Sequence, residues 1–161
     1  MRKKDEQFIL LGLAAIGIAA LLFKRKKNNN ENNTEGLGKL PSEYTKVGRI
    51  NMTIARKAHV KAGDIVVHPN YIRHIEKEHG KQLAELGISA AEYISVIASN
   101  FCQIRKGSGN SILLVVRSSE MYIVLALNMT NLIDDEFPVW EIHTSYPTDK
   151  FTKSQKLLWE R

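Results

Sequence analysis

The chain begins with a long apolar run between basic residues. Residues 8–23 read FILLGLAAIGIAALLF, sixteen positions without a polar side chain. As a helix this run is about 24 Å long against roughly 30 Å of hydrocarbon, and the long stems of Lys4 and Lys24 can cover the difference. Residues 24–27 are basic and no small-residue cleavage site follows the run, so an uncleaved membrane helix is favoured over a signal peptide. It is also favoured over a buried core helix, because such a helix would need a polar face to meet water. The basic excess after the run favours a cytoplasmic C-terminal domain.

A polar, Asn-rich stretch follows the run. Residues 28–46 contain Gly36, Gly38 and Pro41 and lack hydrophobic periodicity. Such a stretch buries too little apolar area to offset its ordering entropy. The pattern therefore predicts a transmembrane anchor over residues 1–27, a disordered linker over residues 28–46 and a folded domain over residues 47–161.

Helical periodicity begins at Pro69. A short apolar stretch, residues 63–68, leads into this proline, whose fixed φ suits the first turn of a helix. Helical spacing then places four side chains on one stripe: Ile72, Ile75, His79 and Leu83. We expect Gly87 to end this region, with Gly80 as an alternative, earlier end. Ser89 and Glu92 have the spacing of a capping box and predict the start of a second helix.

After residue 100 the period becomes two. Strands are predicted over residues 101–106, 112–117, 121–128 and 139–146, and a terminal helix over residues 152–160. The order predicts an α+β fold, with N-terminal helices packed on a roughly four-stranded antiparallel sheet and preceded by a single membrane helix and a flexible tether.

Composition and charge narrow the function only slightly. The single cysteine, Cys102, excludes an internal disulfide and a Cys-rich zinc module. The net charge of +6 divides unevenly: residues 1–46 carry nine Lys/Arg and five Asp/Glu, and residues 47–161 carry fourteen and twelve. Most of the excess therefore belongs to the N-terminal part, and the charge of the domain is weak support for nucleic-acid binding.

Two histidines of the first predicted helix are candidate catalytic residues. His74 and His79 are five positions apart, about 140° of helical rotation, so they do not share a face as the ligands of a zinc-protease helix do. We therefore predict no metal site and no cofactor. His79 lies on the apolar stripe, where it is either a hydrogen-bonded core residue or a partly desolvated group suited to proton transfer. His74 points away from the stripe, as an ordinary surface histidine would.

The last predicted strand supplies the second group of candidates. Strict alternation from Trp140 places Trp140, Ile142, Thr144 and Tyr146 on one face, and Glu141, His143 and Ser145 on the other. If the first set packs under the helices, Thr144 and Tyr146 emerge near His79 and can hold a phosphodiester, although both residue types are also simply good strand formers. Lys106 and Arg117, at strand ends, are candidates for adding positive charge.

These motifs resemble a known nuclease family. The helix segment HPNYIRHIEKEH (residues 68–79), a second helix, a β-meander and a final strand WEIHTSYP (residues 140–147) are similar to the phage-associated barnase–EndoU–colicin–RelE-like nucleases. The resemblance covers roughly residues 50–150. It implies a small α+β, metal-independent, toxin-like ribonuclease whose helix element matches His74 and His79 and whose last-strand element matches Thr144, Ser145 and Tyr146.

The chemistry that this resemblance implies is RNA transesterification through the ribose 2′-hydroxyl. His79 is the expected general acid or base, with His74 as its partner or a structural neighbour. Thr144 and Tyr146 would position the phosphate, and Ser145, Lys106 and Arg117 would contact substrate. The expected partners are RNA, a lipid bilayer through residues 8–23 and an unidentified immunity or other protein. The alternatives are an inactive RNA- or protein-binding module of the same fold and a phage or envelope structural protein.

Overall fold

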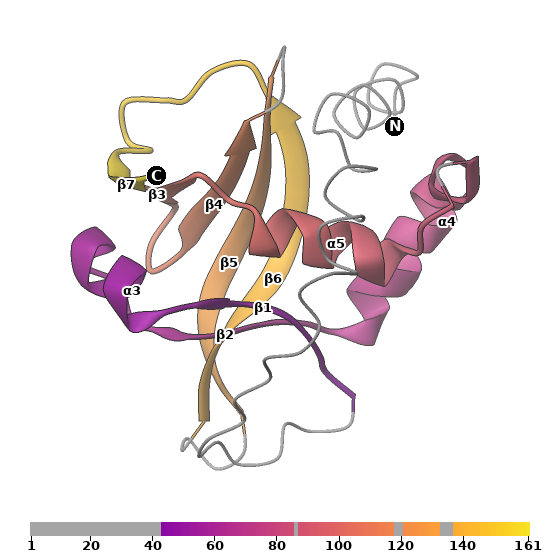
Figure 1. Ribbon diagram of the computed structural model, residues 1–161, viewed down its shortest axis with the longest axis horizontal. Coiled ribbons are helices and arrows are strands. Elements are labelled where there is room, and N and C mark those ends of the chain that lie inside the picture. Colours follow the sequence, from indigo (N-terminus) through magenta and orange to yellow (C-terminus); the bar gives the residue numbers. More distant parts are fainter. Residues whose placement is uncertain (1–42, 86, 118–120, 133–136) are drawn as a thin grey trace.

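Seven strands form one sheet in the order β1-β2-β6-β5-β4-β3-β7 (Figure 1). The computed structural model describes residues 43–85, 87–117, 121–132 and 137–161. The strands are β1 (Thr45–Ile50), β2 (Gly63–Val67), β3 (Gln103–Lys106), β4 (Ile112–Arg117), β5 (Tyr122–Leu132), β6 (Phe137–Thr148) and β7 (Leu157–Glu160). The helices of this part of the chain are α3 (Met52–Ala58), α4 (Pro69–Glu85) and α5 (Ala90–Ser99).

The predicted four-stranded antiparallel sheet is wrong, because the sheet has seven strands and is mixed. The additional strands β1, β2 and β7 extend both edges, and β2 runs parallel to β6. The last four residues of the predicted terminal helix form strand β7, where Trp159 packs edge-on against Phe101 with ring centroids 5.7 Å apart. β1 begins at Thr45, inside the predicted linker. These strands are short and pair with partners distant in sequence, so local periodicity carries little signal for them.

The two predicted helices are confirmed at α4 and α5, including their ends. Gly87 has a φ of +67°, and the N–H of Ile88 donates to the carbonyl of Leu83 at 3.0 Å, which is a Schellman ending for α4. α4 runs through Gly80, so the earlier end is wrong. The capping box is present at Ser89, whose N–H donates to Glu92 Oε2 at 2.8 Å.

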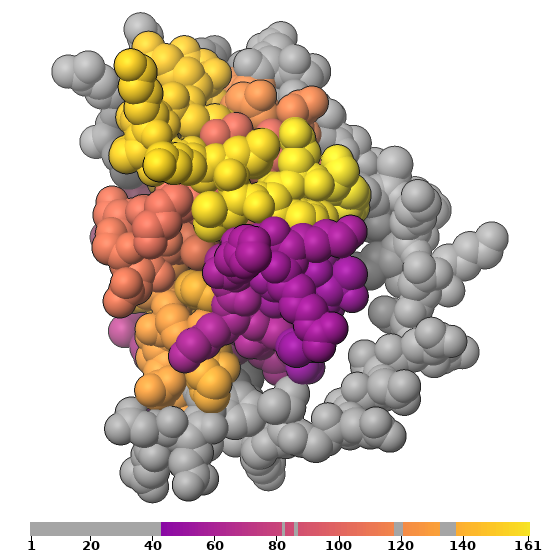
Figure 2. Space-filling view, turned by 90° about the vertical axis from the view of Figure 1, so that its left-hand side faces the viewer, coloured from indigo at the N-terminus to yellow at the C-terminus, as the bar shows by residue number. Residues whose placement is uncertain are grey.

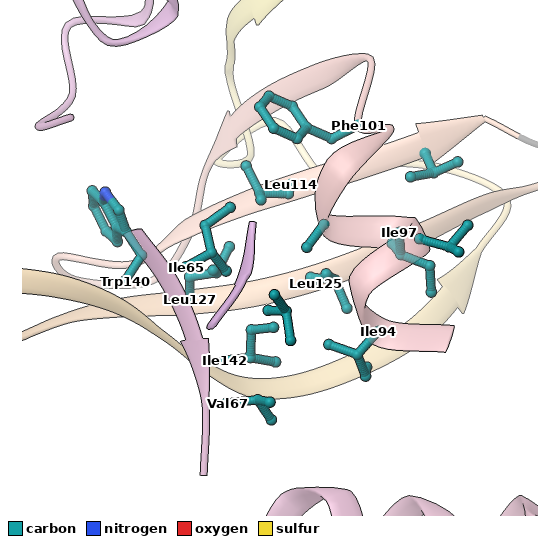
Figure 3. Close-up of a cluster of buried hydrophobic side chains, with 14 of the residues drawn as sticks. Ile65, Val67, Ile94, Ile97, Phe101, Leu114, Leu125, Leu127, Trp140 and Ile142 are labelled. Carbon is teal, nitrogen blue, oxygen red and sulfur yellow. The ribbon is translucent and has the colours of Figure 1, made fainter. Parts of the chain in front are cut away.

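The hydrophobic core lies between the sheet and α5, on the sheet face that we call the inner face (Figure 3). It is built from side chains of α5 such as Ile94 and Ile97 and from alternate residues of the strands, including Leu125 and Ile142. α5 approaches β1 very closely at Gly48, where an added Cβ would lie 3.0 Å from the carbonyl oxygen of Ala98. We call the opposite side of the sheet, which carries the small apolar clusters around Val66 and around Val124, the open face.

A β-bulge in β6 changes which side chains face the helices. Ile142 pairs with Leu127, but the neighbouring residue of β5, Ala126, pairs with Thr144, so His143 is an extra residue in the ladder. After this shift Ser145 lies opposite Leu125 on the inner face.

The predicted alternation through Thr144 and Tyr146 is therefore wrong. Tyr146 pairs with Val124 and packs in the apolar cluster of the open face. Thr144, opposite Ala126, is exposed on that same face. A period of two breaks at a bulge because one residue is unpaired, and every later side chain changes face.

No helix among the described residues is long and apolar enough to cross a membrane. The anchor predicted over residues 8–23 and most of the predicted linker lie outside the described ranges.

Candidate functional site

Ser145 joins two buried phenols at the interface between helices and sheet. Tyr71 of α4 and Tyr93 of α5 both hydrogen-bond to Ser145. Burial raises the pKa of Tyr93 to about 12, and burial together with the neighbouring Tyr93 phenol raises the pKa of Tyr71 further. Both phenols therefore stay protonated at neutral pH. The inner-face position of Ser145 satisfies buried polar groups, which is a structural role.

The two histidines of α4 lie away from the hydroxyls of Thr144 and Tyr146. His79 follows Tyr71 by two helical turns, about 12 Å along the helix axis. Its Nδ1 is buried and has no hydrogen-bond partner among the described residues. His74 is exposed, and its ring stacks on that of Tyr71 with centroids 6.4 Å apart. Because α4 lies on the inner side of the sheet and Thr144 and Tyr146 point from the open face, the structure does not bring the predicted catalytic set together.

The remaining predicted residues also occupy separate places. Arg117 is exposed and forms an ion pair with Glu160 at 3.2 Å. Lys106 Nζ donates to the carbonyl of Gly109 at 2.7 Å, at the tip of the β3–β4 hairpin. Tyr146 is partly covered on the open face, and burial raises its pKa. The predicted substrate-binding cations therefore do not surround a common point with His79.

A different set of polar side chains gathers on the open face beside the bulge. Glu141 and His143 alternate with inward-facing Ile142, so both project from the open face, about 6.6 Å apart along the strand. The bulge adds Thr144 to the same face, where His143 and Thr144 are both exposed. Bulges often occur beside functional sites because they re-aim a side chain in this way.

The end of β2 adds an imidazole and a phenol to this set. β2 runs beside β6 with Val66 opposite Glu141, and His68 follows Val66 on the same face. The Asn70 N–H donates to His68 Nδ1 at 3.1 Å, which leaves Nε2 as the protonated nitrogen of the neutral ring. The ring of Tyr44 lies edge-on to His68 with centroids 5.3 Å apart.

The charge of Glu141 acts on the phenol of Tyr44. The pKa of Tyr44 is raised by burial and, next, by the negative charge of Glu141. The carboxylate and the phenol therefore lie near each other. We call Tyr44, His68, Glu141, His143 and Thr144 the open-face cluster.

The open-face cluster combines a carboxylate, two imidazoles and two hydroxyl groups. Among the described residues, no group of three His, Cys, Asp or Glu side chains is placed to hold a metal ion. A carboxylate and an imidazole on one surface are groups of the kinds that accept and donate protons in general acid–base catalysis. Alternation alone places Glu141 and His143 on one face of the last strand. The bulge and the adjacent β2, which complete the cluster, have no local sequence signal.

Comparisons with known protein families, with curated proteins and with solved structures found no match for this chain. The resemblance of its motifs to the phage-associated nucleases therefore stays a prediction.

Proposed function

We propose that this protein is a metal-independent endoribonuclease whose active site is the open-face cluster. The observation that supports this best is the bulge at His143, which places an exposed imidazole and an exposed hydroxyl beside Glu141 on a sheet face free of described helices. The apolar run of residues 8–23 would hold the enzyme at a membrane.

The proposed reaction needs a base and an acid on opposite sides of one phosphorus atom. The carboxylate of Glu141 takes the proton from a ribose 2′-hydroxyl, and the freed oxygen attacks the adjacent phosphorus. The bond from phosphorus to the 5′-oxygen breaks, and the protonated imidazole of His143 donates its proton to that oxygen. The products are a 2′,3′-cyclic phosphate and a 5′-hydroxyl, so charge and protons balance.

The other members of the cluster would hold the phosphate during this step. His68 is fixed by the Asn70 N–H with its Nε2–H free to donate, and Thr144 offers a hydroxyl next to His143. Donors aimed at the non-bridging oxygens stabilise the charge that develops on phosphorus. The separation of about 6.6 Å between Glu141 and His143 leaves room for a phosphate between the two side chains.

The test is cleavage of a single-stranded RNA by the full chain in the presence of EDTA. We expect products that end in 2′,3′-cyclic phosphate, and we expect an oligonucleotide with a 2′-deoxy residue at the scissile position to resist cleavage. Glu141→Gln and His143→Ala should each lower the rate by about 10²–10⁴-fold. Circular dichroism spectra that match the parent chain would show that these surface variants still fold.

Histidines on α4 provide matched controls. His74→Ala and His79→Ala should keep the cleavage rate within a few-fold, because neither ring reaches the open face. Loss of activity in His79→Ala with full activity in His143→Ala would refute the proposed site and return the assignment to α4. RNA binding without any cleavage would refute the enzyme and leave the binding module as the function.

A further inference from the structure

A hollow of about 470 Å³ lies beside α3, at the end of the inner face away from α4 and apart from the open-face cluster (Figure 1). Its walls come from α3 and the residues after it, from the β3–β4 hairpin and from β7, which adjoin on the side of the molecule drawn in Figure 2. The residues that line it include His59, Lys106, Asn110, Ile112, Trp140, Leu157 and Leu158. Sites for small organic ligands commonly have this size and this mixture of apolar walls and a few polar groups.

His59 stands in this wall in a strained backbone conformation. It has a φ of +54° and is the non-glycine residue with positive φ in the described part of the chain. The position is the one that follows a helix in a Schellman ending, since the N–H of Val60 donates to the carbonyl of Ala55 at 3.0 Å. Glycine adopts this conformation without steric cost, so a histidine here carries a cost that a role for its side chain would explain.

The surroundings of the hollow are basic. The segment 54–62, which supplies Ala58, His59 and Val60 to the lining, contains Arg56, Lys57 and Lys61 and no Asp or Glu. Lys106 adds a cation from the hairpin, and the described residues that line the hollow include no carboxylate. A ligand with a negative group is therefore favoured over a neutral or cationic one.

The floor of the hollow is apolar and rigid. The indole N–H of Trp140 donates to the carbonyl of Lys61 at 3.0 Å, which fixes the ring. Ile112 and Leu158 are packed in or against the main core, and Leu157 is 46% exposed at the edge. A flat ring can lie on this surface, while the side-chain amide of Asn110 can hydrogen-bond to the edge of such a ring.

We propose that this hollow binds a nucleoside monophosphate, with the phosphate at His59 and Lys106 and the base on the floor beside Trp140 and Leu157. The basic rim and the apolar floor favour an anion joined to a ring. The choice of a nucleotide among such anions rests on the proposed function, because a nucleoside monophosphate is the repeating unit of the RNA that this function acts on. The site is separate from Glu141 and His143, which project from the other face of the sheet.

The test is a titration of the full chain with uridine monophosphate, followed by tryptophan fluorescence and by calorimetry. We expect saturable binding that changes the emission, since Trp140 lines the hollow. His59→Gly should weaken binding by tenfold or more while raising the resistance of the chain to urea, so a loss of binding could not be ascribed to unfolding. Leu157→Ser should also weaken binding, and His74→Ala, an exposed histidine on α4, should leave it unchanged.

Simpler probes separate the parts of the proposal. If inorganic phosphate bound as tightly as the monophosphate, the base would contribute nothing to binding. If uridine bound as tightly, the phosphate would contribute nothing. Either result would overturn the proposal. Absence of monophosphate binding in a chain that still cleaves RNA would overturn this inference alone. Binding that depends on His59 in a chain that cleaves no RNA would support this inference while the proposed function fails.

Discussion

Replacing Ser145 by alanine tests whether the bulge of β6 has the structural role assigned to it. Tyr93 is 3% exposed, and its hydroxyl and that of Tyr71 both use Ser145 as a partner. Removing one side of a buried hydrogen bond leaves the other unsatisfied, at a cost of roughly 1–3 kcal/mol. Since two phenols share this serine, we expect Ser145→Ala to lower the free energy of unfolding by about 2–3 kcal/mol. For a domain of this size that is a fall in Tm of roughly 10 °C.

The measurement is urea and thermal unfolding of the full chain, followed by circular dichroism. Ser108→Ala, at an exposed hairpin position, is the matched control and should change stability by less than about 0.5 kcal/mol. Adding Tyr93→Phe to Ser145→Ala should cost less than the sum of the single variants, because the phenylalanine leaves no unsatisfied hydroxyl. An unchanged stability in Ser145→Ala, or full additivity in the double variant, would refute the reasoning.

Three further predictions concern stability. The pKa of Tyr93 is about 12 in the folded chain against an ordinary 10.0, so both states hold the proton below pH 10 and the unfolded state releases it first above that value. The free energy of unfolding should therefore fall between pH 10 and 12, and the Tyr93 phenol should account for up to about 3 kcal/mol of that fall. A fall of the same size in Tyr93→Phe would contradict the prediction. His59→Gly should raise the free energy of unfolding by about 1 kcal/mol, because glycine adopts a left-handed φ without steric cost. A lower urea midpoint in this variant would show that the backbone of His59 is not strained. Gly48→Val should lower the free energy of unfolding by roughly 1–3 kcal/mol, since the added Cβ meets the backbone of Ala98. Gly80→Ala should not lower it, because an added Cβ at this position meets no neighbour within 4 Å.

The helices could be predicted because their signals are local. Pro69 opens α4, Gly87 ends it in a left-handed conformation, and Ser89 begins α5 with its own capping box. Each signal acts within a few residues, so no distant partner is needed to interpret it. β4 and the first half of β5 could be predicted for a similar reason, since residues 112–116 and 121–127 are two apolar runs joined by a short segment.

The candidate site could be predicted only in part. Alternation places Glu141 and His143 on one face of the last strand, and this much is confirmed. The position of Thr144 depends on the bulge, and the approach of His68 depends on the parallel pairing of β2 with β6, which lies more than seventy positions later in the chain. His79 was predicted from its place on the apolar stripe of α4, but such a stripe indicates packing of the helix and not access to the open face of the sheet.

By itself the sequence determined where α4 and α5 begin and end and which residues of the central strands are apolar, because caps, turns and periodicity are interactions between near neighbours. The tertiary structure alone decided the number of strands, the parallel pairing of β2 with β6 and the register after His143. A short strand gains its stability from the sheet it joins, and a bulge is set by the ladder opposite it. Those long-range pairings, and not the local pattern, decide which hydroxyl of the last strand meets the buried phenols and which side chains share the open face.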